Sequence, residues 1–237
     1  MKFGLCLLAA MLPHAMAGPT AVVETARQIP VAASVDVVVV GGSVAGVSAA
    51  VAAAAKGNSV FLIAPRLELG EDIVDTLHLW LEPGETATGP ITERIFAKPG
   101  PAPPLRVKQT LENALLTAGV RFLFGCYATD VLTDRGGHLA GIVMANRAGR
   151  QAVIAKVIVD ATVYASVARR AGARFHAWSG GTVEARRVVL GGKSANEEAI
   201  RRRVSVPACP TPRIPSRLPR SPGRPNDDGA RVPEMSE

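Results

Sequence analysis

A glycine-rich turn between an apolar strand and an alanine-rich helix is the segment of this sequence best suited to hold a ligand. Residues 35–40 read Val-Asp-Val-Val-Val-Val, and they run directly into Gly41, Gly42, Ser43, Val44, Ala45 and Gly46. A small-residue helix is predicted over 47–56, with Gly57 at its end. Backbone amides at the start of such a helix point toward an anion. The strand–turn–helix context therefore predicts that these six residues bind the diphosphate of a dinucleotide.

Each position in the turn has a separate expected role. Gly41 permits the tight bend, and Gly46 allows the helix to pack close to the strand. Ser43 stands where the G-x-G-x-x-G pattern has its middle glycine. Its hydroxyl can donate a hydrogen bond to a phosphate oxygen, so the departure is a mild one.

The end of the next strand departs further from the pattern. The strand is predicted over 59–63, and an acidic residue that binds ribose hydroxyls is expected at its tip. The chain has Ala64 there, which has no side-chain acceptor, and Arg66 follows two residues later. Arg66 suits the 2′-phosphate of NADP, although a solvent-facing arginine is the commoner explanation. Ala64 and Arg66 are thus candidates for the adenosine side of the site.

The remaining elements predict an α/β fold with a Rossmann-like parallel sheet and an inserted antiparallel β-meander. An amphipathic helix is predicted over 105–118, with apolar residues at helical spacing and Gly119 after it. Short strands are expected over 120–124, 129–133, 139–145 and 151–155, joined by glycine-containing turns. A further buried strand, 156–162, precedes a helix over about 164–171.

Three segments resemble the bacterial FAD-dependent oxidoreductase family of the glutathione-reductase-like, two-dinucleotide-binding-domain class. They are Leu69–Asp72, Leu79–Glu85 and Ala145–Thr162, and the likeness covers about residues 35–192. The resemblance implies FAD, with its diphosphate at the Gly41–Gly46 turn and its adenine near Ala128. It also implies that Ala161 and Thr162 lie near the flavin-side phosphates. The family continues this strand with glycine, whereas the chain has Val163.

No catalytic residue can be assigned from the sequence, because flavin carries the redox chemistry itself. His78 alternates with leucines and faces either a cleft or solvent. His138 and His176 lack metal-ligand spacing with Cys126 or Cys209, so no metal site is expected. Cys126 is interpreted as a lone buried thiol, since no C-x-x-C pair is present.

The two ends of the chain are predicted to lie outside the fold. Residues 1–17 combine Lys2, an apolar stretch and an Ala-Met-Ala ending, which is typical of a signal peptide cleaved after Ala17. Export is therefore expected, and the apolar stretch is too short to span a membrane. The expected order is a linker over 18–34, an FAD-binding domain over 35–175 and the start of a truncated substrate region over 176–200. The fold is thus expected to be incomplete at its C-terminus.

Residues 201–237 carry eight arginines, four acidic residues and eight prolines, and they show no hydrophobic period. They predict a disordered Arg/Pro-rich tail, and a shifted reading frame near residue 200 is one hypothesis for its origin. The net charge of +7 lies mostly at this end, because residues 18–200 hold 18 basic and 16 acidic side chains. Only 4% of the chain is aromatic, which argues against nucleic-acid binding.

Three functions remain open from the sequence. The first is an FAD-dependent oxidoreductase, or its FAD-binding portion, that transfers hydride or electrons between a small-molecule substrate and an electron acceptor. The second is a non-catalytic remnant in which Ser43, Ala64 and Val163 weaken cofactor binding. The third is an NADP-binding reductase module that uses Arg66.

Overall fold

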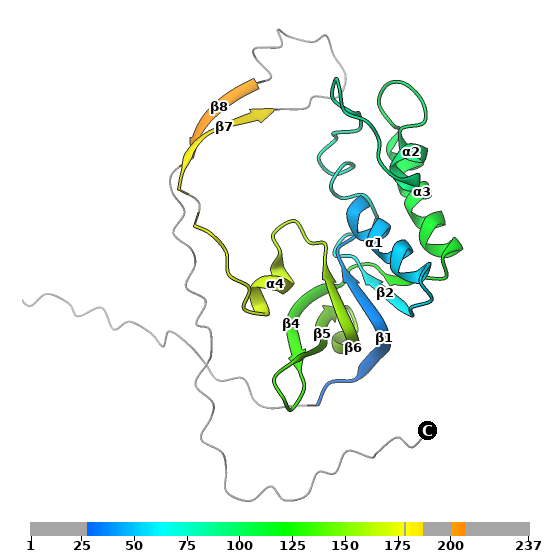
Figure 1. Cartoon of the computed structure of the whole chain (residues 1–237), viewed down its shortest axis with the longest axis vertical. Coiled ribbons are helices and arrows are strands. Elements are labelled where there is room, and N and C mark those ends of the chain that lie inside the picture. The colour runs from blue at the N-terminus through cyan, green and yellow to red at the C-terminus, as the bar shows by residue number, and fades with distance from the viewer. Residues whose placement is uncertain (1–27, 178, 187–200, 207–237) are drawn as a thin grey trace, which may run out of the picture.

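The computed structural model describes residues 28–177, 179–186 and 201–206. Six strands form one sheet in the order β3-β2-β1-β6-β5-β4, of which β3, β2, β1 and β6 are parallel (Figure 1). The parallel strands are β1 (Val31–Val40), β2 (Val60–Ile63), β3 (Arg121–Leu123) and β6 (Gly149–Asp160). The α/β class and the Rossmann-like parallel sheet predicted from the sequence are confirmed.

Strand β1 is buried on both faces because it lies in the middle of the sheet. Val37 and Val39 pack with the helices on one face, whereas Val38 and Val40 pack into a second core on the other face. The alternation follows from the two-residue period of a strand. It explains why residues 37–40 are all valine, and it confirms the interpretation of this run as a doubly buried strand.

Three helices cover one face of the parallel strands. They are α1 (Val44–Ala54), α2 (Pro90–Ile95) and α3 (Pro104–Thr117). Val47 and Ala50 of α1 are fully buried in this core, as are Leu111 and Leu115 of α3. The sequence predicted α1 and α3 but not the six-residue α2, which begins at a proline in the first helical position.

The meander covers the opposite face. Strands β4 (Tyr127–Thr133) and β5 (Leu139–Asn146) are antiparallel to each other, and β5 is antiparallel to β6. Ile142 and Met144 of β5 share a core with Phe61 and Ile63 of β2. The meander strands continue the same hydrogen-bonded sheet, but they also pack over the face of the parallel strands that the helices leave open. The structure thus has three layers: the helices, the parallel strands and the meander. The inserted antiparallel meander predicted from the sequence is confirmed.

Strand β6 differs from the prediction in two respects. The sequence predicted separate strands over 151–155 and 156–162, but one continuous strand pairs with β5 in its first half and with β1 along most of its length. Residues 156–162 were also expected to be buried, yet Val157 is 52% exposed. The neighbouring Ile158 and Val159 are partly buried, each against one of the two cores. A short helix, α4 (Ser166–Arg170), follows β6.

The predicted tail also needs a correction at its start. Arg201–Val206 forms strand β8, which pairs antiparallel with β7 (Gly181–Arg186) in a separate two-stranded sheet. The β-branched residues Val204 and Val206 suit a strand. The predicted signal peptide and the rest of the predicted tail lie outside the described residues. Among the described helices, none has the length and apolar character needed to cross a membrane.

Candidate cofactor-binding site

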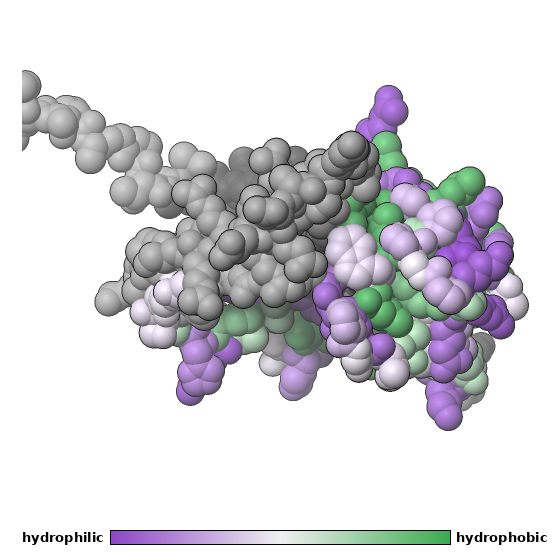
Figure 2. Space-filling view, turned by 90° about the horizontal axis from the view of Figure 1, so that it is seen from above, coloured by the Kyte–Doolittle hydropathy of each residue, from purple (hydrophilic) through white to green (hydrophobic). Residues whose placement is uncertain are grey.

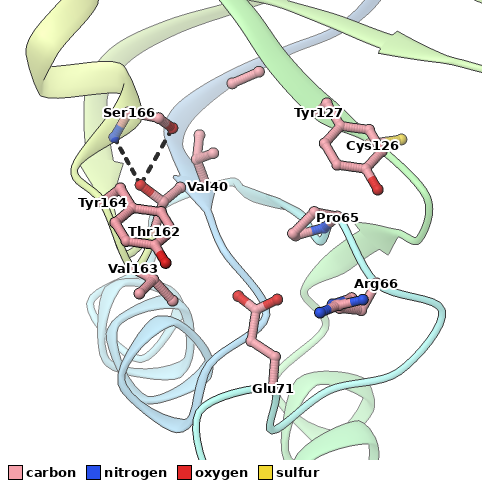
Figure 3. Close-up of a pocket in the computed structure, with 11 residues that line it drawn as sticks. Val40, Pro65, Arg66, Glu71, Cys126, Tyr127, Thr162, Val163, Tyr164 and Ser166 are labelled. Carbon is pink, nitrogen blue, oxygen red and sulfur yellow. Dashed lines mark hydrogen bonds between the residues drawn. The ribbon is translucent and has the colours of Figure 1, made fainter. Parts of the chain in front are cut away.

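A cleft of about 320 Å³ opens at the carboxyl ends of the parallel strands. It begins at the last residue of β1 and is bounded by the segments that follow β2 and β6 and by the start of β4 (Figure 3). In open parallel sheets, ligands bind at this edge. The lining residues are Val40, Pro65, Arg66, Glu71, Cys126, Tyr127, Ala128, Thr162, Val163, Tyr164 and Ser166.

The backbone of the glycine turn is so closely packed at Gly41 and Gly46 that neither position has room for a Cβ atom. Gly41 has a φ of +120°, and a Cβ there would lie 2.5 Å from the Ala161 carbonyl oxygen. A Cβ on Gly46 would lie 2.4 Å from the Gly41 carbonyl oxygen. The predicted packing roles of Gly41 and Gly46 are therefore confirmed, while the binding of a diphosphate by the turn stays a prediction.

Ser43 is buried and caps helix α1. Its hydroxyl oxygen accepts a hydrogen bond from the Gly46 amide at 3.0 Å, and its hydrogen is directed at the Ala161 carbonyl oxygen, 3.4 Å away. Serine is among the preferred N-cap residues for this reason. The hydroxyl that was expected to face a phosphate is thus engaged within the protein, and it ties α1 to the end of β6.

Two acidic side chains, Glu71 and Asp72, lie against the turn. The family resemblance puts their loop near the cofactor, whereas the sequence alone favours a solvated acidic loop. The Val44 amide donates to both carboxylate oxygens of Asp72, at 3.0 and 3.2 Å. The Glu71 carboxylate faces the cleft (Figure 3). Burial raises the pKa of both carboxyl groups above the ordinary value, and an interaction with the Gly42 amide offsets part of this larger effect for Glu71. The sequence signal for both is the Leu69–Asp72 segment, where they follow Gly70.

The two candidates for the adenosine side occupy different environments. Ala64 is fully buried beneath the turn, where a Cβ on Gly42 would lie 2.9 Å from its own Cβ. It does not line the cleft. Arg66 does line the cleft, and its Nε lies 3.0 Å from a carboxylate oxygen of Asp75. Of the two, only Arg66 can reach a ligand there.

Asp160, the last residue of β6, holds in place the cleft wall formed by residues 162–166, which lies across from Arg66 (Figure 3). Its carboxylate accepts from the amide and hydroxyl of Thr162, at 3.0 and 2.7 Å. It also accepts from the amides of Val167 and Ala168 in α4, at 2.9 and 2.8 Å. The Thr162 hydroxyl oxygen in turn accepts from the Ser166 amide at 2.8 Å (Figure 3). One carboxylate thereby fixes the turn from 161 to 168, including Thr162, a predicted site residue.

Ala165, inside that turn, has a left-handed backbone with φ 48° and ψ 48°. This conformation costs an alanine about 1–2 kcal/mol relative to glycine. We expect Ala165→Gly to raise the free energy of unfolding by about 0.5–1 kcal/mol, because strain relief exceeds the added entropy of the unfolded chain. Urea denaturation measures it. Ala168→Gly, in the right-handed α4, is the matched control and should lower stability by about 1 kcal/mol. A lower midpoint for Ala165→Gly would contradict the prediction.

The rim of the cleft carries exposed apolar and aromatic residues. Val163 and Tyr164 are 70% and 79% exposed, and Tyr127 on the other side is 59% exposed. Ala128, predicted to lie near the adenine, lines the cleft next to Tyr127. Figure 2 shows one face of the described residues, on which hydrophobic residues reach the surface between hydrophilic ones.

The histidines singled out in the sequence lie away from the cleft lining. His78 Nε2 lies 3.1 Å from Glu82 Oε1, and the ring packs edge-on against Trp80. His138 contacts Asp134 in an exposed turn. Cys126 is free and buried, as predicted, and burial raises the pKa of its thiol. Within the described ranges, no group of three acidic, histidine or cysteine side chains is arranged to hold a metal ion.

The backbone and shape of the site fit the ADP half of FAD. Gly41 and Gly46 leave no room for a Cβ in the turn, and the cleft is lined mainly by apolar residues with Arg66 at one side. The mismatched feature is charge, because Glu71 and Asp72 place two carboxylates where a diphosphate would carry negative charge of its own.

Two solved structures are similar to part of this chain, at low sequence identity and with TM-scores below 0.5. A geranylgeranyl bacteriochlorophyll reductase-like protein from Thermoplasma acidophilum is 21% identical with a TM-score of 0.43, over 59% of this chain and 42% of that one. THI4 from Thermovibrio ammonificans is 22% identical with a TM-score of 0.41, over 60% of this chain and 64% of that one. The chain therefore spans between about two fifths and two thirds of the length of these structures. No curated protein matches the sequence.

A protein-family match covers the whole site. The model described as FAD dependent oxidoreductase matches residues 36–187, which include the glycine turn, the acidic segment and the turn after β6. The match extends over more than half of the chain and agrees with the resemblance seen in the sequence. This protein belongs to the FAD dependent oxidoreductase family.

Proposed function

We propose that this chain binds FAD through the ADP half and serves an oxidoreductase that transfers hydride or electrons between a small-molecule substrate and an electron acceptor. FAD is the cofactor of the family to which the chain belongs. When bound, flavin supplies the redox chemistry, which is why no catalytic triad is needed.

The cleft beside the glycine turn is the observation that carries the proposal. It lies at the carboxyl edge of β1, β2 and β6, and its lining includes Val40, the residue that precedes Gly41. A dinucleotide placed there has its diphosphate at the glycine turn and its adenosine toward Ala128 and Arg66. Thr162 and Val163, on the opposite wall, then face the flavin side.

The chain's own residues bind and orient the cofactor. The Gly41–Gly46 turn allows close approach of the backbone, and Asp160 holds the wall that carries Thr162. Arg66 supplies a positive charge within the cleft, partly balanced by Asp75. The exposed Val163 and Tyr164 offer an apolar surface on which a substrate-bearing segment can pack.

Arg66 is also the observation that favours a second candidate, an NADP-binding module. Its guanidinium lines the cleft, where it could pair with a 2′-phosphate. The ion pair with Asp75 already engages one nitrogen of that guanidinium, so the FAD proposal has the stronger support.

Titration of the purified full chain with FAD, with absorbance and melting temperature as the two readouts, tests the proposal. We expect flavin absorbance bands that stay with the protein through gel filtration. At a hundredfold excess of FAD over its dissociation constant, the stabilisation should be about 2.7 kcal/mol. Stabilisation by NADPH but not by FAD would instead support the second candidate. A colourless protein that neither nucleotide stabilises would identify a non-catalytic remnant.

Export and the binding of a substrate and an electron acceptor belong to the same proposal. Residues 1–17 have the composition of a signal peptide with cleavage after Ala17, which supports a location outside the cytoplasm. The substrate and the electron acceptor would bind beyond the described cleft, on the flavin side of Val163.

A further inference from the structure

A carboxylate of the protein itself, that of Asp72, is hydrogen-bonded at the start of helix α1. The Asp72 carboxylate accepts from the Val44 amide through both of its oxygens, at 3.0 and 3.2 Å. The first turn of α1 has no acidic residue of its own, so Asp72 is the carboxylate that meets the positive end of the helix dipole. The general rule for dinucleotide-binding turns places the diphosphate at this same helix start.

The segment that carries Asp72 is fixed in place. The Gly70 amide donates to the Gly42 carbonyl oxygen at 2.8 Å, and Leu69 is fully buried in the helix-side core. A Cβ on Gly70 would lie 3.0 Å from Val107 and 3.1 Å from Leu111 of α3. Displacement of the carboxylate therefore has to come from rotation of the Asp72 side chain, because the backbone of the segment is packed.

Glu71 adds a second negative charge at the same place. The Glu71 carboxylate faces the cleft and interacts with the Gly42 amide. The Asp72 carboxylate accepts a hydrogen bond from the Val44 amide. The other groups around the pair do not neutralise it locally: Arg66 pairs with Asp75, and Lys108 of α3 pairs with Glu68. The residues of the opposite wall, from Thr162 to Ser166, are uncharged.

We propose that Asp72 is an affinity-determining residue of the FAD site, because its carboxylate occupies the diphosphate position at the start of α1 and competes with the cofactor for it. The inference rests on the proposed function and refines it. FAD binds only when the carboxylate gives up the Val44 amide, and two negative charges from the protein then stand beside the two of the diphosphate. Neutralising Asp72 weakens the competition, because an amide oxygen is a poorer acceptor than a carboxylate, and it removes part of the repulsion.

The competition predicts a pH dependence of binding. Burial raises the pKa of Asp72 and of Glu71 in the free protein, and a neighbouring diphosphate raises each pKa further. Binding is therefore coupled to proton uptake, so FAD affinity increases as the pH falls from about 8 to about 5. The gain levels off once the carboxyl groups are already protonated in the free protein.

The test compares wild type, Asp72→Asn and Asp130→Asn by titration with FAD and with ADP, followed by flavin fluorescence and calorimetry. Asparagine still accepts from the Val44 amide, so Asp72→Asn should fold, and its melting temperature without ligand verifies this. We expect at least fivefold tighter binding of FAD and ADP at about pH 8, and a flatter pH dependence. Asp130→Asn removes one exposed charge on β4 and should leave both affinities unchanged.

The possible failures are distinguishable. If wild type binds FAD and Asp72→Asn binds it equally or more weakly, Asp72 is only a helix cap and the inference is overturned. If wild type fails to bind but Asp72→Asn binds FAD and ADP, the inference is supported in its strongest form. If neither protein binds FAD or ADP at any pH, the proposed function fails and the inference fails with it.

Discussion

A Gly46→Ala variant is expected to bind FAD at least tenfold more weakly than wild type, a loss of about 1.4 kcal/mol. The added Cβ would lie 2.4 Å from the Gly41 carbonyl oxygen and 3.2 Å from the Ala161 Cβ, where neither a backbone atom nor a strand end can give way easily. Helix α1 must therefore move away from β1 and β6, and the glycine turn moves with it. FAD titration by fluorescence measures the loss.

The same variant should also be less stable. Overpacking of this kind costs about 1–3 kcal/mol, and the better helix propensity of alanine recovers about 1 kcal/mol of it. Urea denaturation without ligand therefore tests the packing argument independently of the cofactor. Ala52→Ser adds one atom at an exposed position of the same helix. It should leave the affinity unchanged and lower the stability only by the helix-propensity difference, about 0.5 kcal/mol. Wild-type affinity and stability in Gly46→Ala would contradict the close approach seen in the structure.

Replacement of Asp160, which holds the cleft wall from Thr162 to Ser166, is expected to lower stability more than replacement of any residue that lines the cleft. Its carboxylate accepts four hydrogen bonds, two from Thr162 and two from the amides of Val167 and Ala168. Hydrogen bonds to a charged group are each worth about 1.5–3 kcal/mol, and buried amides left without a partner add to the loss. We expect Asp160→Ala to lower the free energy of unfolding by about 3 kcal/mol.

The Asp160 prediction includes a graded control. Asp160→Asn keeps one accepting oxygen and the size of the side chain, so its loss should be about half as large. Asp130→Ala, on exposed β4, should leave the denaturation midpoint in place. Amide hydrogen exchange would show whether protection is lost first at 162–168, as a positioning role requires. Equal midpoints for wild type and Asp160→Ala would rule out this role.

The three departures from the glycine-turn pattern have different structural meanings. Ser43 uses its hydroxyl to cap α1, so it stabilises the turn. Ala64 is buried beneath the turn, and an acidic side chain would not fit there without displacing the packing around Gly42. Val163 is exposed on the rim, where it leaves room for a ligand but offers no hydrogen-bonding side chain. The carboxylates of Glu71 and Asp72 oppose the binding of a diphosphate more than these three departures do, because they bring negative charge to the glycine turn.

The local pattern of the sequence by itself determined the architecture. Valines over 37–40, glycines at the turn and small residues in α1 are properties of adjacent positions, and strand and helix periods report them directly. The fold class was predicted on that basis, the family from the resemblance of three segments, and a lone buried Cys126 from the lack of a C-x-x-C pair. All three predictions are confirmed. The glutathione-reductase-like subclass, the signal peptide and the binding roles of individual residues stay predictions.

Only the tertiary structure decided how the site is charged and held. Asp72 meets Val44 across 28 residues of chain, and the cleft wall depends on Asp160 turning back to the amides of α4. The continuity of β6 and the pairing of β8 with β7 are likewise settled by partners distant in the chain. Sequence periodicity shows which face of an element is apolar, but it does not show which carboxylate reaches which amide. That outcome depends on the path of the intervening loop and on the packing of Leu69 and Gly70 that anchors it.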